Sequence, residues 1–326
     1  MTRLSHIRLL AVGGTISGLP DARGGIQMTL TGAELVQSLP ELAGVAEVEM
    51  GDFASIPSFS ITVSDMRALA LEVLRAFDEG CEGVVITHGT DTIEETAYGL
   101  ALMLPRDRPV VLTGAMRNPS LPGTDGPANL LAACRVATSA EAAGLGPVVI
   151  LNDEIHAARF AAKTHTTRPS TFASPGAGPI GEVVEGRVYI WFRPAYEDYV
   201  GLPESVEHVT VELVRTMADP EETLLRAAVE SAPAGIVIEG TGGGHVPPPL
   251  LPALDEALRS GIPIVVASRC PSGRNLERTY GMPGGEIDLI ERGALPAGAL
   301  AGHKARLRLL AGVALGRDPS SLFPVA

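Results

Sequence analysis

Two short segments rich in glycine and threonine carry side chains that could take part in catalysis. Gly13–Thr15 reads Gly-Gly-Thr, and His88–Thr92 reads His-Gly-Thr-Asp-Thr. A threonine hydroxyl is a weak nucleophile at neutral pH and needs a base, while glycine lets a substrate approach the backbone closely. Gly13–Thr15 has neither the GxGxxG spacing of a dinucleotide site nor the lysine of a phosphate loop. Taken alone, it is better explained as a tight turn after a strand.

The second segment, His88–Thr92, offers more polar groups than a helix cap uses. Asp91 and Thr92 could cap a helix that begins after them, but one cap is enough. His88 could serve as a base. A histidine in such a turn is more often a hydrogen-bonded structural group, and we favour that interpretation.

Lysine is rare in this chain, where Lys163 and Lys304 are the only two lysines among 25 basic residues. Lysine can lose its proton and arginine cannot, so each lysine is a candidate base. A lysine acts as a base only when it is neutral, which requires desolvation or a neighbouring positive field. We expect Lys163 to be functional and a Lys304→Arg substitution to be silent.

Composition limits the classes of protein to which the chain can belong. Its 326 residues, 45% of them hydrophobic, suit two globular domains or one large one. Its net charge of −13 disfavours nucleic acid as a partner. No stretch reaches the roughly 18 uninterrupted apolar residues of a membrane helix, and the N-terminal apolar run is too short for a signal peptide. We therefore expect a cytoplasmic protein with no membrane partner.

The three cysteines, Cys81, Cys134 and Cys270, are scattered along the chain and form no CxxC pair. This spacing predicts neither a disulfide framework nor a zinc site. Each cysteine is most simply a small buried hydrophobic residue. We therefore predict no metal ligands.

Short apolar runs alternate with helical patterns in the first part of the chain, which predicts a mainly parallel sheet covered by helices on both faces. Thr31 with Glu34, and Thr92 with Glu95, fit the capping box of a helix start. The predicted strands, rich in β-branched residues, are Ile7–Val12, Val45–Met50, Val84–Thr87, Val110–Thr113 and Val148–Leu151.

A smaller α/β domain is predicted in the last third of the chain. Asp219–Glu222 supplies an N-cap, a proline and early acids for a helix, and Ala234–Glu239 and Pro263–Ser268 resemble strands. We predict an N-terminal α/β catalytic domain over 1–194, a linker over 195–211 and a C-terminal α/β domain over 212–326.

Ligands of open α/β sheets bind beyond the carboxyl ends of the strands. Gly13–Thr15, His88–Thr92 and Gly114–Arg117 each follow a predicted strand, and Lys163 lies in the loop after Leu151. Two threonine hydroxyls, a carboxylate and an amine are therefore expected at one sheet edge.

These motifs resemble the bacterial-type L-asparaginase (asparaginase/glutaminase) family over nearly the whole chain. Two threonine motifs and a lysine motif in this order are far more specific than any one of them. The matching segments are Gly13–Ile16, Thr87–Thr92, Glu94–Ala97, Thr113–Arg117, Asp125–Leu130, Lys163–Thr167, Ser268–Arg269 and Pro271–Gly273.

The resemblance implies a two-domain fold and hydrolysis of the asparagine side-chain amide through an acyl-enzyme, with no cofactor or metal. Thr15 would be the nucleophile. Thr90 would work with Lys163 to activate water or the nucleophile, and Asp91 would hold the substrate ammonium group. The resemblance also implies a homotetramer or homodimer whose sites lie near the dimer interface.

Further substrate contacts follow from the same resemblance. A serine binds the substrate carboxylate in the family; we prefer Ser58 for this role and keep Ser60 as the alternative. The remaining predicted substrate contacts are Gly14, Gly89 and Ala115, with backbone amides and hydroxyls on the glycine turns binding the oxyanion.

The chain departs from the family in the loop that follows the nucleophile. Relatives carry a tyrosine there, whereas Leu19–Leu30 has none, and Ile26 or Gln27 lies near the expected place. We predict that the region Ser17–Thr31, which contains this loop, is mobile without ligand. Tyr280 of a partner subunit is the candidate replacement, with an ordinary interface role as its alternative.

A second departure is Gly242–Gly244, which stands where secreted relatives carry an asparagine. Two functions remain open: an asparaginase with possible glutaminase activity, or an amino-acid-binding or sensing protein on the same fold. The retained threonines and lysine favour the enzyme.

Overall fold

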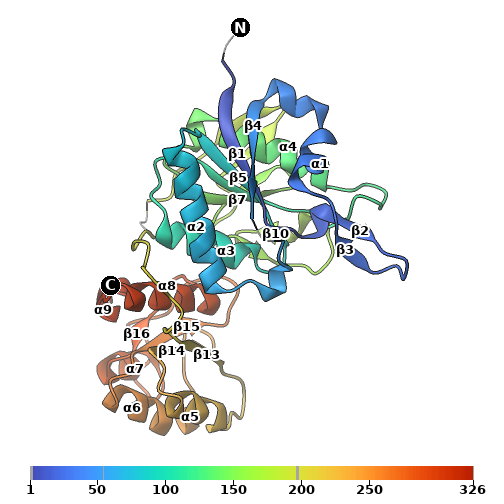
Figure 1. Ribbon diagram of the computed structural model, residues 1–326. Coiled ribbons are helices and arrows are strands. Elements are labelled where there is room, and N and C mark those ends of the chain that lie inside the picture. Colours follow the sequence, from blue (N-terminus) through green and yellow to red (C-terminus); the bar gives the residue numbers. More distant parts are fainter. Residues whose placement is uncertain (1–2, 54, 196–197, 326) are drawn as a thin grey trace. The chain divides into compact units, whose positions relative to one another are not determined.

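The computed structural model describes residues 3–53, 55–195 and 198–325. The chain forms two compact units, Met1–Tyr199 and Val200–Ala326. The predicted linker, 195–211, includes residues 196 and 197, which lie outside the described residues. Each unit has its own sheet (Figure 1), as expected of a two-domain α/β protein.

The first unit is built on an eight-stranded sheet of order β12-β11-β8-β7-β6-β5-β1-β4. Five adjacent strands are parallel: β4 (Ala46–Asp52), β1 (Ser5–Ala11), β5 (Gly83–Thr87), β6 (Val110–Thr113) and β7 (Pro147–Leu151). Three more continue the sheet in antiparallel fashion: β8 (Glu154–Ala157), β11 (Gly181–Val184) and β12 (Arg187–Ile190). The expected larger, mainly parallel N-terminal sheet is confirmed.

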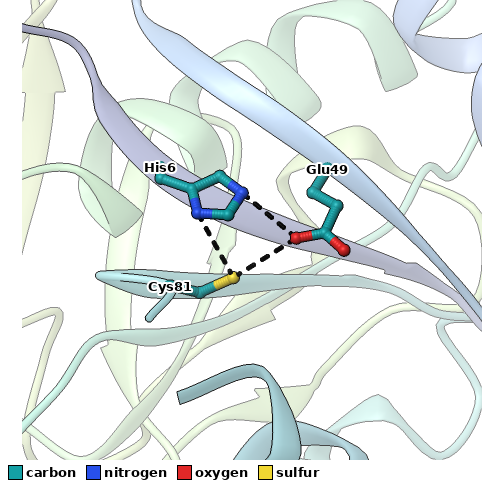
Figure 2. A group of neighbouring side chains, drawn as sticks. All are labelled: His6, Glu49 and Cys81. Atoms are coloured by element: carbon teal, nitrogen blue, oxygen red, sulfur yellow. Dashed lines mark hydrogen bonds and ion pairs between the residues drawn. The ribbon is translucent and has the colours of Figure 1, made fainter. Parts of the chain in front are cut away.

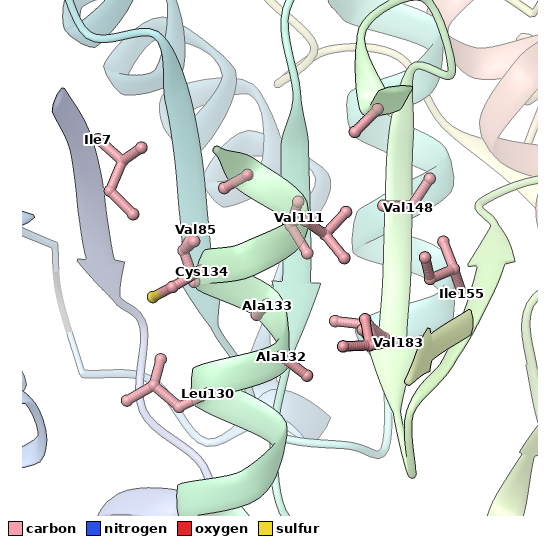
Figure 3. Close-up of a cluster of buried hydrophobic side chains, with 14 of the residues drawn as sticks. Ile7, Val85, Val111, Leu130, Ala132, Ala133, Cys134, Val148, Ile155 and Val183 are labelled. Carbon is pink, nitrogen blue, oxygen red and sulfur yellow. The ribbon is translucent and has the colours of Figure 1, made fainter. Parts of the chain in front are cut away.

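Helices cover both faces of this sheet (Figure 1), because its strands are apolar on both sides. The long helices are α2 (Val63–Asp78), α3 (Ile93–Met103) and α4 (Gly126–Ala137), and α1 (Gly32–Gln37) is short. Figure 3 shows the core beneath α4, where Leu130 and Cys134 lie near Ile7, Val85 and Val111 of the strands.

Two small antiparallel pairs lie outside the main sheet. They are β2 (Gly18–Pro20) with β3 (Ile26–Met28), and β9 (Ala162–Lys163) with β10 (Phe172–Ala173). Short 3₁₀ helices include η1 (Thr15–Ser17), η2 (Pro40–Gly44), η3 (Ser58–Ser60), η4 (Ala140–Ala142), η5 (Pro169–Thr171) and η6 (Pro248–Leu250).

The second unit has a four-stranded parallel sheet of order β13-β14-β15-β16. The strands are β13 (Val211–Arg215), β14 (Gly235–Gly240), β15 (Ile264–Ser268) and β16 (Leu295–Pro296). The helices are α5 (Thr223–Glu230), α6 (Leu251–Arg259), α7 (Glu286–Arg292), α8 (Gly302–Ala314) and α9 (Pro319–Leu322). The smaller C-terminal α/β domain is thus confirmed as a fold class.

Of the three helix starts predicted from capping residues, one is confirmed and two are wrong. The capping box of Thr31 and Glu34 is present at α1. The one predicted at Thr92 is wrong, because the Thr92 hydroxyl donates instead to the Ser58 carbonyl at 2.6 Å. The start predicted at Asp219–Glu222 is also early: α5 begins at Thr223, and no side chain caps it.

The cysteines differ in their surroundings. Cys81 and Cys134 are buried as expected, whereas Cys270 is exposed in the turn after β15, where its thiol lies 3.7 Å from the Gly242 carbonyl. The prediction that Cys270 is buried is therefore wrong. In the part of the chain that the structure describes, no helix is both long and apolar enough to cross a bilayer.

Candidate active site

A cavity of about 490 Å³ lies in the first unit at the carboxyl ends of β1 and β5. This is the edge of a parallel sheet where ligands usually bind, and the volume suits a small molecule. The lining residues are Gly14, Thr15, Ile26, Gln27, Met28, Pro57, Ser58, Phe59, Gly89, Thr90, Asp91, Met116, Lys163 and Thr166.

The two glycine turns that frame this cavity meet backbone to backbone. Gly14 has a φ of 95°, and a Cβ atom built on it would lie 2.5 Å from both the Cα and the N of Gly89. A Cβ atom on Gly89 would lie 2.5 Å from Ser58 Oγ. Only glycine fits at these positions, so the close approach of the first and second motifs depends on both residues.

Thr15 opens the 3₁₀ turn η1 directly after Gly14. The Ser17 hydroxyl and backbone amide both donate to the Gly14 carbonyl, at 2.9 and 3.0 Å, which fixes the turn. Thr15 lines the cavity, as a nucleophile requires.

Lys163 joins the second motif through its amine. Lys163 Nζ donates to Thr90 Oγ1 at 3.0 Å and to Asp91 Oδ1 at 2.6 Å. The Lys163 side chain is 16% exposed, whereas that of Asp91 is 55% exposed. The amine is thus shielded, and the carboxylate remains accessible to a cationic ligand.

The backbone holds Lys163 at this place. Its amide donates to Glu94 Oε2 at 2.8 Å, and its strand β9 pairs with β10. The following residue, Thr164, donates from its amide and its hydroxyl to the Thr171 carbonyl. These contacts place a loop lysine beside a threonine that lies 73 positions earlier in the chain.

Ser58 is buried beneath the second motif, and its Oγ accepts a hydrogen bond from the Asp91 amide at 3.3 Å. It lines the cavity, whereas Ser60 is exposed and does not. The geometry thus favours Ser58 over Ser60 as the serine that contacts a ligand.

His88 is a structural group, as favoured from the sequence. Its Nδ1 lies 2.7 Å from the Gly89 carbonyl and its Nε2 lies 3.0 Å from Thr96 Oγ1. Burial lowers the pKa of His88 to about 4, so the ring is neutral at pH 7. It supports the turn and does not line the cavity.

The turn after β6 is organised by Asp125, whose carboxylate accepts the amides of Met116 and Arg117 at 3.0 and 2.8 Å. Met116 therefore faces the cavity. Ala115, a predicted substrate contact, is 1% exposed, and its side chain packs in the core beneath α4. Its contact with a substrate stays a prediction.

The β2–β3 hairpin forms one wall of the cavity, where relatives of the resembled family carry a tyrosine. Ile26 and Gln27 both line it, so they occupy the place that the sequence indicated. The hairpin tip is closed by Asp21, whose Oδ1 accepts the amides of Arg23 and Gly25 at 2.8 and 2.9 Å.

Tyr280 lies in the second unit and is 41% exposed. Its ring meets His245 edge to face at 5.0 Å, and its amide donates to the buried Glu286 carboxylate at 2.7 Å. The nearby turn of Gly242 contains an isolated bridge from Thr241 to His245. The predicted contact of Tyr280 with a partner's substrate stays a prediction.

Sequence reasoning missed five residues that line the cavity: Met28, Pro57, Phe59, Met116 and Thr166. Apolar residues give no chemical signal in a sequence. Met116 and Thr166 lie within the matching segments Thr113–Arg117 and Lys163–Thr167, and that position is the one signal that could have found them.

Comparisons with known proteins agree with this arrangement. Residues 6–196 match the family model described as asparaginase, N-terminal, and residues 210–322 match the glutaminase/asparaginase C-terminal domain. An L-asparaginase of Bacillus licheniformis is 34% identical over 93% of this chain and 94% of that protein. A glutaminase-asparaginase of Pseudomonas aeruginosa is 33% identical, over 98% and 88%.

A solved structure shares the fold across both units. It is described as a probable cytoplasmic L-asparaginase from Campylobacter jejuni, and it matches with a TM-score of 0.86 and 31% identity over 98% of each chain. The fold expected from the motifs is therefore confirmed.

Proposed function

Because this chain belongs to the asparaginase family, we propose that it hydrolyses the side-chain amide of L-asparagine to L-aspartate and ammonia. The proposal includes glutamine as a second substrate, because one of the similar proteins is named for both activities. One observation carries the proposal: Lys163, Thr90 and Asp91 form a hydrogen-bonded set in the same cavity as Thr15.

Thr15 is the nucleophile in the proposed reaction. Its Oγ attacks the side-chain amide carbon and gives up its proton, and the C–N bond then breaks as ammonia leaves with that proton. A threonyl ester remains. Water attacks the ester, the C–Oγ bond breaks, and aspartate is released while Thr15 regains its hydroxyl proton.

Thr90 and Lys163 move protons in this scheme. The Thr90 hydroxyl can pass a proton between a reacting water and the Lys163 amine, which lies 3.0 Å from it. Asp91 accepts the ammonium group of the substrate on its exposed side. A ligand without an ammonium group would give the Asp91 carboxylate no new partner, so the site should bind amino acids more tightly than such ligands.

Backbone and hydroxyl groups complete the binding. Gly14 and Gly89 leave room for the substrate beside the peptide chain, and amides on these turns stabilise the oxyanion. The Ser58 hydroxyl accepts from the Asp91 amide, so its own proton remains available to the substrate carboxylate.

The direct test is ammonia release by the purified full-length protein from L-asparagine, L-glutamine and D-asparagine. We expect the highest kcat/KM with L-asparagine. One methylene group changes binding by only about 1–3 kcal/mol, so some activity on glutamine is compatible with the proposal. Binding of L-asparagine without ammonia release would refute the enzyme and indicate a binding or sensing protein.

We further propose a homodimer or homotetramer that acts in the cytoplasm. The motifs of the family support the assembly, and the description of the Campylobacter jejuni structure as cytoplasmic supports the compartment. Light scattering on the purified protein and fractionation of the source cells test the two statements separately.

A further inference from the structure

A second cluster of reactive side chains lies toward the amino ends of β1 and β5, whereas the candidate active site lies at the carboxyl ends of these strands. His6 stands near the start of β1, Glu49 lies on the neighbouring strand β4, and Cys81 comes two residues before β5. Figure 2 shows the three side chains turned toward one another. Since β5 has five residues, about 16 Å of strand separates Cys81 from the turn of Thr90.

The three groups are spaced as ligands of one ion. His6 Nε2 lies 3.1 Å from Glu49 Oε2, and Cys81 Sγ lies 3.8 Å from that same oxygen. Cys81 Sγ lies 3.9 Å from the other ring nitrogen, His6 Nδ1. One ion binds only one of these two nitrogens, and with one ligand atom taken from each residue the three atoms lie within 4.8 Å of one another. Tetrahedral zinc with its usual bond lengths places its nitrogen, oxygen and sulfur ligands about 3.3–3.6 Å apart. Rotation of the His6 ring and small side-chain shifts would bring this set to that geometry.

Backbone hydrogen bonds of the sheet hold these three residues close together in the absence of an ion. The β1–β4 register pairs Arg8 with Glu49, and the Glu82 amide donates to the His6 carbonyl at 2.7 Å, which ties the segment of Cys81 to β1. The thiol is 1% exposed, whereas the His6 side chain is 28% exposed. The cluster therefore has a buried sulfur and an entrance from solvent.

Arg8 orients the carboxylate. Its guanidinium donates to Glu49 Oε1 and to Glu79 Oε2, each at 2.5 Å, which leaves Glu49 Oε2 directed toward His6 and Cys81. Such outer contacts commonly fix metal ligands. The two carboxylates of Glu49 and Glu79 and the one guanidinium of Arg8 have a net charge of −1. A Cys81 thiolate would bring the net charge to −2, which a divalent cation balances.

We propose that His6, Glu49 and Cys81 form a zinc site, with solvent as the fourth ligand. A thiolate, an imidazole and a carboxylate together suit Zn²⁺. Binding replaces the S–H bond by a Zn–S bond and releases the proton to solvent. Because the site joins β1, β4 and the segment before β5, zinc stabilises the first unit and leaves catalysis unchanged.

The test uses untagged, chelator-treated full-length protein carrying Cys270→Ser, because Cys270 is exposed and could bind metal by itself. Cobalt is titrated first, and zinc then displaces it. We expect one equivalent of metal, a thiolate-to-cobalt charge-transfer band and a higher Tm with zinc. X-ray absorption of the zinc form should show one sulfur ligand.

Variants on the same background decide the assignment. Cys81→Ala should abolish the charge-transfer band, and Glu49→Gln should weaken metal binding at least about tenfold. Cys134→Ala, which removes the other buried thiol, should leave the band intact. If Cys81→Ala unfolds, His6→Asn provides the same test at a partly exposed position. A missing band in the parent, or a band that survives Cys81→Ala, overturns the proposal.

Ammonia release is measured in parallel on the same protein. Its absence would refute the proposed function and would leave the proposed zinc site unaffected.

Discussion

The Lys163 amine donates to a hydroxyl and a carboxylate on two consecutive residues, Thr90 and Asp91. Arginine at position 163 would keep a positive charge and several donors, but it could not give up a proton. We therefore expect Lys163→Arg to lower kcat for asparagine by at least about 10², nearly as much as Lys163→Met. Steady-state ammonia release measures the effect.

Unchanged far-ultraviolet circular dichroism and Tm would show that both Lys163 variants fold. Substantial activity in Lys163→Arg would mean that Lys163 acts as a fixed charge and not as a proton carrier. Lys304 is unsuitable as the matched control, because its side chain is 2% exposed within α8. The expectation that Lys304→Arg is silent therefore loses its basis, since a buried lysine is costly to replace.

The two threonines of the site make a second prediction. Thr15→Ala removes the proposed nucleophile and Thr90→Val removes the hydroxyl beside Lys163, so each should lower kcat at least about 10²-fold. Thr138→Val, at the end of α4 and outside the cavity lining, is the control and should keep full activity. Near-normal turnover by Thr15→Ala would eliminate Thr15 as the nucleophile.

Polar motif residues were the predictable part of the site. Thr15, Thr90, Asp91 and Lys163 line one cavity, as the order of the motifs indicated. The cluster of His6, Glu49 and Cys81 could not be predicted, because its residues come from three separate segments. Spacing along the chain identifies only ligands that are neighbours in sequence.

At the scale of elements, the contact between the two glycine turns has a testable consequence. Alanine at Gly14 would place its Cβ 2.5 Å from Gly89 backbone atoms, which cannot move as a flexible side chain can. We expect Gly14→Ala to lower kcat/KM at least tenfold, because the two motifs would be forced apart.

Gly80→Ala is a matched control for Gly14→Ala. Gly80 has the same φ of 95°, but nothing lies within 4 Å of a Cβ placed there. Both variants place an alanine at positive φ, which costs about 1–3 kcal/mol. Gly14 also has a ψ of −179°, and only the Gly14→Ala variant has the clash. Equal loss of activity in both would show that backbone strain, and not the contact, is responsible.

The parallel strands were predictable because they are buried on both faces and rich in β-branched residues. The run Val110–Thr113 matches β6 in full, and Val84–Thr87 falls one residue short of β5. The antiparallel strands β8, β11 and β12 went unpredicted, since half-exposed edge strands such as β12 lack a continuous apolar run. The predicted mobility of the Ser17–Thr31 loop stays a prediction.

For the whole molecule, buried histidines predict a pH dependence of stability. Burial lowers the pKa of both His88 and His156 to about 4, below the value near 6.5 of an exposed histidine. Between these values the unfolded chain binds protons that the folded chain does not. The free energy of unfolding should therefore fall as the pH is lowered from about 6.5 to about 4.

Urea denaturation at several pH values, followed by the fluorescence of Trp191, the chain's only tryptophan, measures this dependence in the first unit. His156→Gln should reduce the slope in that window by up to about 1.4 kcal/mol per pH unit. An unaltered slope in His156→Gln would contradict the prediction.

Assembly of the molecule carries a further prediction, about Tyr280. If a partner's Tyr280 supplies the hydroxyl that the β2–β3 hairpin lacks, Tyr280→Phe should lower kcat about tenfold or more, which is about 1.4 kcal/mol of barrier. Light scattering should show the oligomeric state unchanged, since the ring and its contact with His245 remain. Unchanged kcat would assign Tyr280 to the interface alone.

The different exposure of the two lysines also determines how the protein responds to amine-directed labelling. Lys304 is almost inaccessible, so Lys163 at the cavity is the more reachable of the two side-chain amines. An acylating reagent should therefore modify side chains chiefly at the cavity of the candidate active site, and a bound amino acid should protect the protein from it. Attaching polymers or dyes through lysine is harmless for many enzymes, but here it would modify Lys163 in the cavity. Conjugation through the exposed Cys270 is the chemical route that spares Lys163.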